Sequence, residues 1–509
     1  MKEKNKVMTS HENKSFAHGV LRNISFNIFS TFLDRLGGLI LTILLARILM
    51  PELFGVYSLT LSITLLLLTI ADLGLGQTLI RFVSDSLKHG KKGEKLAREY
   101  FIFISKIRIF SVIIFSVLLL LFSGIIANLI FKKPELILPF KFASLYLFFA
   151  TLLDTFAFTF YAVKKVKFYV FKEAAFQVTR IILAPILAIY LSEQYKVPGV
   201  FIALTIASAL ALFVVLILIK KRYPFFFSEK QLNIDKKRVL KFTLFLAVIS
   251  LSSLFFAYID SVMLGLFLPI EYVGYYRIAF MIVSSVASLT LFLNVIMPIF
   301  TQLEGQNLVN AFKKVFHFTS ILTFPTAFGL ALVAAPFIKL AFGDTYLPAV
   351  FPLYFLSFLI IETSLLSYFS LVFQAKEKPQ IPTYATIVAT ILNVILNYVL
   401  ITKLVKISYE YAMAGSAIAT LITRFSLAIF VGIAAYKKFG LKIQASSILK
   451  PLVASLVMST ILLLFFKPTS LSTGILEIFI GAAIYFLILF LIKGIKKDDF
   501  IYFKNLIKK

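Results

Sequence analysis

The chain of 509 residues contains no cysteine, no tryptophan and only four histidines, and just 15% of its residues are charged. Without cysteine, disulfide frameworks and thiolate chemistry are excluded. The histidines are too scattered to hold a metal, and no Gly-Lys-Ser/Thr phosphate loop is present, so we expect no metal, no ATP and no other cofactor. Soluble proteins carry about a quarter charged residues, so the low charge excludes an ordinary soluble protein.

The sequence is rich in long apolar runs, and 60% of its residues are hydrophobic. A helix needs about twenty apolar residues to cross a bilayer, whereas a barrel strand alternates over about ten. The runs here are continuous, so the sequence predicts an all-α polytopic membrane protein with about 14 transmembrane helices. The expected spans are 23–49, 53–77, 100–127, 137–162, 173–191, 198–220, 241–267, 272–300, 317–341, 348–374, 381–403, 411–436, 451–466 and 473–493.

The charge that is present is strongly basic, with 52 Lys and Arg against 24 Asp and Glu and a net charge of +28. In a soluble protein this balance would suggest nucleic acid. In a membrane protein, Lys and Arg collect in cytoplasmic loops. With the N-terminus placed in the cytoplasm, the inner segments hold 37 of these residues and the outer loops hold 9. We therefore expect a multi-pass protein of the cell (plasma) membrane with both termini cytoplasmic and no nucleic-acid partner.

Three short motifs recur in the same order, at offsets of 219, 213 and 216 residues and at equivalent hairpin positions. Six spans per copy is an even number, so both copies enter the membrane from the same side. This predicts two parallel six-helix lobes around a central cavity, followed by two extra C-terminal helices. The paired motifs are Glu52-Leu-Phe-Gly55-Val-Tyr57 with Glu271-Tyr-Val-Gly274-Tyr-Tyr276, Phe160–Lys165 with Phe373–Lys378, and Gly199–Ala203 with Gly415–Ala419.

The repeat also divides the chain into expected parts. A basic segment joins the two copies, and the helices after the second copy lie outside the repeat. The parts are a cytoplasmic tail (1–22), an N-terminal six-helix lobe (23–220), a cytoplasmic linker (221–240), a C-terminal six-helix lobe (241–436), and helices 13 and 14 with a basic cytoplasmic tail (437–509).

Specific motifs surround the first two spans and open the eighth. They are Leu45-Ala-Arg47-Ile-Leu-Met-Pro51-Glu52-Leu-Phe54-Gly55-Val-Tyr57, Ala71-Asp72-Leu-Gly74-Leu-Gly76, Arg81-Phe-Val and Val273-Gly274-Tyr-Tyr276-Arg277-Ile-Ala279. In these residues the chain resembles the Wzx-type polysaccharide and oligosaccharide flippases of the multidrug/oligosaccharidyl-lipid/polysaccharide exporter superfamily. Met50 departs from the pattern, since the family usually has Gly before the Pro.

The resemblance implies a transporter that flips a lipid-(pyro)phosphate-linked oligosaccharide from the inner to the outer leaflet, for polysaccharide or glycoconjugate biosynthesis. Its implied partners are the lipid-linked glycan, the lipid bilayer and, as further candidates, glycosyltransferases or a polymerase of the same pathway. In this superfamily spans 1, 2, 7 and 8 line the central cavity.

Ionisable residues inside spans are costly, so each is a functional candidate. A guanidinium can pair with a phosphate through two hydrogen bonds, and hydroxyl and amide groups can meet sugar hydroxyls. Two other readings stay open: polar stripes also form packing seams between helices, and an Arg at a span end can reach the interface. The candidate substrate-binding residues are Arg35, Asp34, Asn27, Thr31, Arg47, Asp260, Arg277 and Ser284.

Five further charges lie within or near spans and are candidates for structural or coupling roles. Because paired charges survive best in lipid, we expect the ion pairs Asp154–Arg180 in the first lobe and Glu362–Arg424 in the second. Asp72 lies at the inner end of span 2, where a structural role at the hairpin and a transport role are both open.

Two other functions compete with flipping. A cation-coupled multidrug antiporter of the same superfamily would use Asp34 as its proton or sodium carboxylate. A membrane-embedded glycan polymerase or ligase would carry its chemistry in a large outer loop, but the longest one here is about 128–136. We therefore predict a transporter and not an enzyme.

Overall fold

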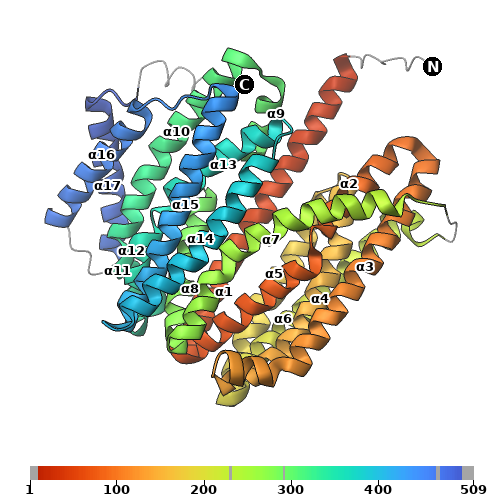
Figure 1. Ribbon diagram of the computed structural model, residues 1–509, viewed down its shortest axis with the longest axis horizontal. Helices are drawn as coiled ribbons and strands as arrows, with labels where there is room; N and C mark the ends of the chain where they lie inside the picture. The colour runs from red at the N-terminus through yellow and green to blue at the C-terminus, as the bar shows by residue number, and fades with distance from the viewer. Residues whose placement is uncertain (1–9, 229–231, 290–292, 466–470, 496–509) are drawn as a thin grey trace. The chain divides into compact units, whose positions relative to one another are not determined.

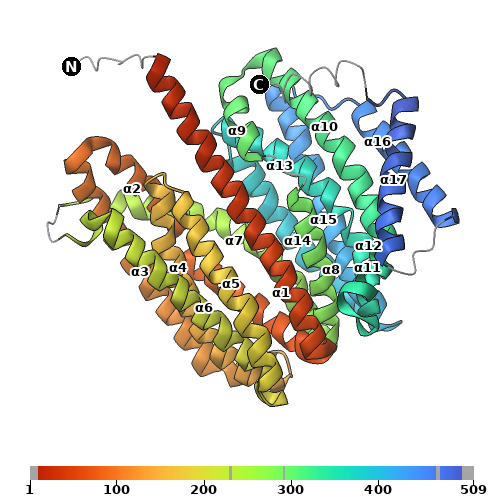
Figure 2. The ribbon, with the colours of Figure 1, turned by 180° about the vertical axis from the view of Figure 1, so that it is seen from behind.

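The computed structural model describes residues 10–228, 232–289, 293–465 and 471–495, and the ends of both predicted cytoplasmic tails lie outside these residues (Figures 1 and 2). The chain forms two compact units. Unit 1 comprises Met1–Ile48 and Thr60–Leu254, and unit 2 comprises Leu49–Leu59 and Phe255–Lys509. Each described unit is built of helices, and no strand occurs among the described residues.

Unit 1 is a bundle in which α6 packs against α4 and α5, and α3 packs against α4 (Figure 2). Its first element is two helices joined at Met50, whose φ of 59° and ψ of 169° break the helical path. Two of these helices also contribute to unit 2, α1 over residues 49–59 and α7 from Phe255 onward. The helices are α1 (Ser10–Asp72), α2 (Leu75–Ser86), α3 (Gly90–Ile125), α4 (Ile137–Ala162), α5 (Lys167–Tyr190), α6 (Glu193–Arg222) and α7 (Lys236–Phe267).

Unit 2 contains the remaining helices, with α14 against α15, α13 against α15, and α10 against both α13 and α16. They are α8 (Ile270–Leu289), α9 (Leu293–Gln302), α10 (Gly305–Leu332), α11 (Ala334–Phe342), α12 (Val350–Leu356), α13 (Leu359–Ala375), α14 (Gln380–Leu404), α15 (Tyr409–Phe439), α16 (Ser446–Phe465) and α17 (Leu471–Leu491). Short helical turns lie at Leu87–His89, Ile126–Ile130, Pro134–Leu136, Pro224–Phe227 and Asp344–Ala349.

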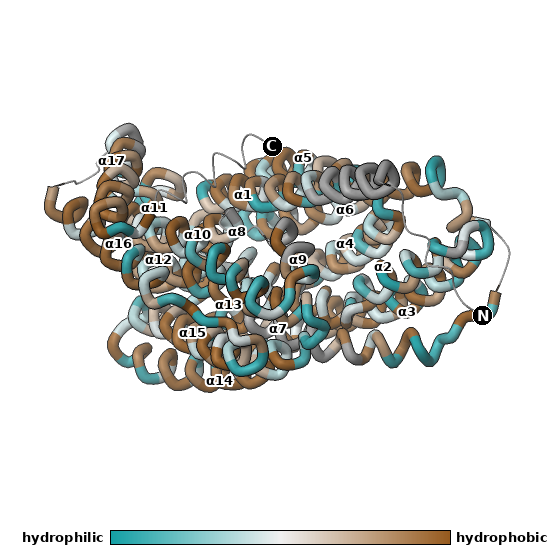
Figure 3. Tube along the Cα trace, turned by 90° about the horizontal axis from the view of Figure 1, so that it is seen from above, coloured by the Kyte–Doolittle hydropathy of each residue, from teal (hydrophilic) through white to brown (hydrophobic). Residues whose placement is uncertain are grey.

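The helices have the length and the surface of membrane spans. Among the described residues, nine helices are long and apolar enough to cross a bilayer, and a bent pair, 344–356 with 359–375, makes ten. One of the nine, 25–86, is far longer than the roughly 20 residues of one crossing. Helices α14, α15 and α16 are hydrophobic over most of their length (Figure 3).

Each of the fourteen predicted runs coincides with a helix or with consecutive helices. The first two runs share α1, the eighth comprises α8 and α9, and the ninth and tenth are each broken into two helices. The prediction of an all-α, multi-pass membrane protein is confirmed, and the structure is consistent with the count of 14.

Two copies of one repeated motif meet inside unit 2. Gly55, from Glu52-Leu-Phe-Gly55, packs so closely on α8 that an added methyl group would overlap the carbonyl oxygen of Ile270. A methyl group on Gly274, from Glu271-Tyr-Val-Gly274, would lie 3.1 Å from the amide nitrogen of Gly55. Both positions therefore need glycine for the close approach of the two backbones, and the segment 49–59 belongs to unit 2.

Candidate functional site

Unit 1 holds a charged network between α1 and α5, centred on Asp34. Gln177 Nε2 donates to Asp34 Oδ1 at 3.2 Å and to Glu173 Oε1 at 2.7 Å. Arg180 Nε donates to Gln177 Oε1 at 2.8 Å, and its Nη2 lies 3.9 Å from Asp34 Oδ1. Gln177 thus links two carboxylates and a guanidinium, so the Asp34 side chain is held by α5.

Lys172 extends this network to α4. Its Nζ lies 3.4 Å from Asp154 Oδ1 and 3.3 Å from Glu173 Oε2, and its side chain is 7% exposed. The predicted pair Asp154–Arg180 is therefore wrong, because Asp154 pairs with Lys172 and Arg180 pairs with Asp34. Arg180 lies about 12 Å farther along α5 than Lys172. At that position the nearby acidic residue is Asp34 of α1, whereas Asp154 of α4 lies near Lys172.

A glycine allows α1 to approach α5 at this point. A methyl group on Gly37 would overlap Gln177 Oε1, the atom that accepts the hydrogen bond from Arg180. Any larger residue at position 37 would have to displace Gln177. The short distance between the two helices is therefore a precondition for the network, and Gly37 lies one turn from Asp34 on α1.

Asn27 and Thr31, two further polar residues of α1, also form hydrogen bonds within unit 1. Tyr161 Oη of α4 donates to Asn27 Oδ1 at 2.9 Å, and the Thr31 hydroxyl donates to the backbone carbonyl of Asn27 at 2.9 Å. Thr31 remains exposed. Arg35 differs from them, because its Nε is buried without a hydrogen-bond partner among the described residues. Arg47 is exposed near the break at Met50.

The hairpin that follows span 2 contains a buried ion pair that the sequence analysis missed. Asp72 Oδ1 accepts from the backbone N–H of Gly76 at 3.1 Å and lies 2.8 Å from Arg108 Nε. The Arg108 side chain is 2% exposed and its guanidinium lies over the ring of Phe158, 5.1 Å from the centroid. Asp72 thus fastens α2 to α3. The available signal was an Arg inside the apolar run 100–127.

Unit 2 encloses Asp260 in neutral hydrogen-bond donors. Its Oδ2 accepts from Tyr276 Oη at 2.6 Å and from Thr420 Oγ1 at 2.7 Å, and its Oδ1 accepts from Asn397 Nδ2 at 2.9 Å. Asn397 in turn accepts from the Ser416 hydroxyl at 2.6 Å. The carboxylate is 4% exposed and connects α7 with α8, α14 and α15.

The predicted pair Glu362–Arg424 is present in unit 2, with Arg424 Nη1 3.8 Å from Glu362 Oε2. Glu362 is fully buried on α13, while the Arg424 side chain on α15 is 23% exposed. Of the two candidates on α8, Arg277 is partly buried and Ser284 donates to the backbone carbonyl of Met281 at 3.1 Å. The structure therefore bonds Ser284 to its own helix.

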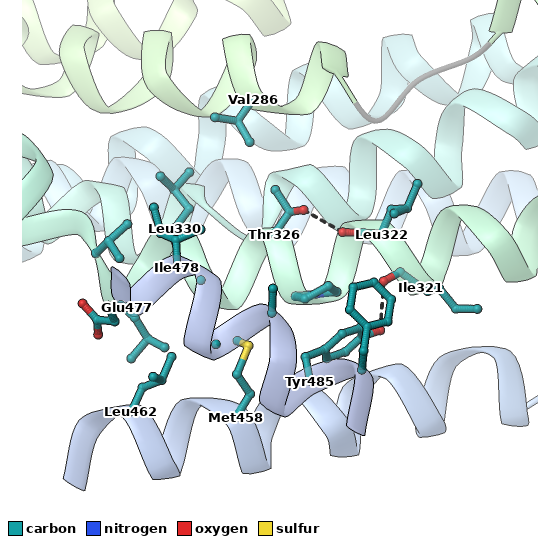
Figure 4. Close-up of a pocket in the computed structure, with 17 residues that line it drawn as sticks. Val286, Ile321, Leu322, Thr326, Leu330, Met458, Leu462, Glu477, Ile478 and Tyr485 are labelled. Atoms are coloured by element: carbon teal, nitrogen blue, oxygen red, sulfur yellow. Dashed lines mark hydrogen bonds between the residues drawn. The ribbon is translucent and has the colours of Figure 1, made fainter. Parts of the chain in front are cut away.

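A separate apolar pocket of about 380 Å³ lies among α10, α16 and α17 (Figure 4). Val286 of α8 also lines it, and Tyr485 Oη donates to the carbonyl of Ile321 at 2.9 Å. Its polar groups are few, Glu477 and Thr326 among them, and none of the predicted site residues lines it. This lining suits hydrocarbon and does not suit sugar or phosphate.

Residues 20–304 match the family described as polysaccharide biosynthesis protein. The chain belongs to this polysaccharide biosynthesis protein family. It is also 26% identical over 284 residues to a probable low-salt glycan biosynthesis flippase, Agl15, of Haloferax volcanii. That match covers 54% of this chain and 58% of the relative, so the chain spans less than two thirds of the curated protein that it matches.

Solved structures show how far the family fold extends along the chain. The lipid II flippase MurJ in an inward closed conformation is 17% identical, with a TM-score of 0.70 over 95% of this chain and 100% of that one. An inward-facing multidrug resistance MATE family transporter of the MOP superfamily is 14% identical, with a TM-score of 0.61 over 80% of this chain and 96% of that one. At these identities the likenesses show the fold alone, and the resemblance found in the sequence is confirmed by the family match over residues 20–304.

Proposed function

We propose that the protein flips a lipid-(pyro)phosphate-linked oligosaccharide from the inner to the outer leaflet, for polysaccharide or glycoconjugate biosynthesis. The observation that carries the proposal is the family match over residues 20–304, supported by a relative named as a probable glycan biosynthesis flippase. The fold shared with a lipid II flippase fits the same function. The proposed activity is the movement of the substrate across the membrane, and it includes no catalytic step.

The exposure of Asp34 supports a water-filled path along α1. The Asp34 side chain is 52% exposed although it lies within an apolar span, about 16 residues before the break at Met50. That separation corresponds to about 24 Å along a helix. A charged group at such depth is costly against lipid and is tolerated where it faces water or a partner. Arg180 and Gln177 hold one oxygen, and water would serve the exposed part.

Within this proposal, Arg35 contacts the pyrophosphate. A bare phosphate could not cross hydrocarbon, because an unpaired charge is prohibitively costly to bury. Arg35 is partly buried beside the exposed Asp34, and a guanidinium carries five N–H donors, so its nitrogens other than Nε can offer donors to a phosphate. Arg47 and Arg277 are further phosphate candidates, and the exposed Thr31 can meet sugar hydroxyls. Asn27, Asp260 and Ser284 are engaged by neighbours, so we assign them to positioning helices.

A multidrug antiporter is the second candidate, since MATE transporters share the fold. It fits less well, because the curated relative is named as a glycan flippase and because Asp34 is already held by Arg180 and Gln177. An antiporter would need Asp34 available to a cation.

We also propose that both termini lie in the cytoplasm, and that glycosyltransferases or a polymerase of the same pathway are partners of the protein.

The orientation has a direct test, because the chain contains no native cysteine. Lys92 is exposed in the first turn of α3, close after the end of α2. A Lys92→Cys protein should resist a membrane-impermeant thiol reagent in intact cells and react once the cells are opened. Labelling in intact cells would overturn the orientation.

The transport role is tested at Arg35 by complementation of a flippase-deficient strain, with an immunoblot for protein level. Arg35→Ala should abolish complementation while the protein stays inserted and abundant. Arg35→Lys should rescue only in part, because Lys keeps the charge and loses the bidentate geometry. The matched control is Lys106→Ala, which removes an exposed cation from α3.

Three outcomes decide the matter. Full complementation by Arg35→Ala would remove Arg35 from the mechanism. A collapse of the protein level would assign Arg35 a structural role. If the wild-type chain restores drug resistance and not glycan export in the deficient strain, the antiporter replaces the flippase.

A further inference from the structure

The break in α1 gives a side chain a backbone conformation that normally belongs to glycine. Met50 has a φ of 59° and a ψ of 169°. Pro51 follows it, and a proline excludes the helical region for the residue before it, which accounts for the extended ψ. The positive φ has a different origin, because a residue before proline ordinarily has a φ of about −120°. Strain of this kind persists only where the surrounding structure enforces it.

Packing fixes the chain on both sides of Met50. Leu45 before the break and Phe54 after it are fully buried. Gly55 approaches the backbone of Ile270 so closely that an added methyl group would overlap its carbonyl oxygen. Met50 itself is 49% exposed, so its own side chain gains little from the conformation that it adopts. The two flanking helices, and not contacts of Met50, therefore impose the positive φ.

Met50 also lies where the chain passes from one compact unit to the other. The chain passes between the units at 48–49, at 59–60 and at 254–255. The second and third of these places lie within helical stretches of α1 and α7, whereas the first lies next to the break. A residue at the end of a helix absorbs a change of φ and ψ that the middle of a helix resists. A rearrangement of the units would therefore act first on the backbone of Met50.

We propose that Met50 is a strained hinge, which disfavours the conformation with a positive φ relative to a second conformation in which its φ is negative. A transporter that opens alternately to the two sides of a membrane needs at least two conformations. Strain of the size usual for such a residue changes the ratio of two conformations by about five- to thirtyfold. The hinge goes beyond the proposed function, because it concerns the protein without substrate and its test needs no glycan.

The absence of native cysteine allows spin labels to be placed at chosen positions of the full-length protein. One label pair is Lys141→Cys in unit 1 with Lys406→Cys in unit 2, and a second pair is Lys92→Cys with Lys438→Cys, all at exposed positions. Pulsed electron paramagnetic resonance in lipid nanodiscs gives the distance distribution of each pair without substrate. Met50→Gly should shift the ratio of the distance populations about tenfold, because glycine adopts a positive φ without the steric penalty.

Two matched variants assign the shift to the backbone of Met50. Met50→Ala removes the long side chain but keeps the Cβ and its strain, so its distance distribution should match that of the wild type. Lys164→Gly relieves another positive φ, of 57°, which follows α4 inside unit 1, and it should also leave the ratio unchanged. Thermal unfolding measures the strain separately, because Met50→Gly should unfold at a higher temperature than Met50→Ala.

Several results would overturn the proposal. Distance distributions that are the same in Met50→Gly and the wild type would show that Met50 is not a hinge, even if the unfolding temperature rises. A Met50→Gly protein that unfolds below Met50→Ala would show that the backbone is not strained. An equal shift in Met50→Ala would assign the effect to the methionine side chain. An equal shift in Lys164→Gly would assign it to backbone strain in general, with no special role for the break in α1.

Discussion

Unit 1 surrounds its membrane carboxylates with cations, whereas unit 2 surrounds Asp260 with neutral hydroxyl and amide donors. In unit 1, Lys172 lies between Asp154 and Glu173, and Arg180 lies beside Asp34. Removing a cation there strands negative charge in a low-dielectric interior. Removing one neutral donor from Asp260 leaves two others in place. Both arrangements stabilise a carboxylate within a membrane span. The stability of unit 1 should therefore depend more strongly on a single side chain than that of unit 2 does.

The largest effect is expected at Lys172. Lys172→Met should lower the free energy of unfolding by about 3–5 kcal/mol, because it leaves Asp154 and Glu173 without their shared cation. Adding Asp154→Asn should recover part of the loss. The measurement is the thermal unfolding of purified protein, with Lys165→Met as the control because Lys165 is exposed. If the Lys172→Met protein is as stable as the control, unit 1 does not depend on this cation, and the proposed difference between the units is wrong.

The ion pair of unit 2 should respond less strongly. Arg424→Ala should destabilise the protein, and Arg424→Ala with Glu362→Ala should destabilise it by less than the sum of the single changes. We expect a coupling of about 1–3 kcal/mol in the double-mutant cycle, because Glu362 is fully buried while Arg424 is partly exposed. Strictly additive changes would show that the 3.8 Å separation carries no interaction.

Gly37 tests whether the network of unit 1 depends on helix approach. Gly37→Ala should cost about 1–3 kcal/mol, because the methyl group overlaps Gln177 Oε1. Gly124→Ala is the matched control on α3, where nothing lies within 4 Å of the added methyl group, so it should be neutral or slightly stabilising. Equal stability of the two variants would mean that Gln177 moves aside at no cost.

The smallest effect is expected in the neutral network. Tyr276→Phe should cost about 1.5 kcal/mol, the low end for a hydrogen bond to a charged group, since Asp260 keeps the hydrogen bonds from Thr420 and Asn397. The same thermal assay measures it. A loss as large as that of Lys172→Met would show that unit 2 relies on one donor as heavily as unit 1 relies on one cation.

The helices could be predicted from the sequence because bilayer thickness sets the length of an apolar run. The pair Glu362–Arg424 could be predicted because each is a lone charge in its own span. Lys172 could not, since it ends a stretch with Lys164, Lys165 and Lys167 that reads as a cytoplasmic loop. Its place inside the bundle depends on α5 beginning at Lys167.

The partners of Asp34 and Asp260 lay beyond the sequence for a related reason. Gln177, Tyr276 and Thr420 are uncharged, and nothing in an apolar run marks which polar residue will face an acid on another helix. Such contacts depend on the rotation of each helix about its axis. Periodicity gives that rotation for one helix at a time, so the candidate faces could be named and their partners could not.

The meeting of Gly55 with Gly274 has a consequence for synthesis on the ribosome. The segment 49–59 enters the membrane more than two hundred residues before the helix on which it packs. Chains emerge at about 5–20 residues per second, so this segment waits at least ten seconds or so for its partner. If the chain is cut within 221–240, the N-terminal fragment contains residues 49–59, which pack in unit 2. The C-terminal fragment should therefore fold completely only when both fragments are made in the same cell.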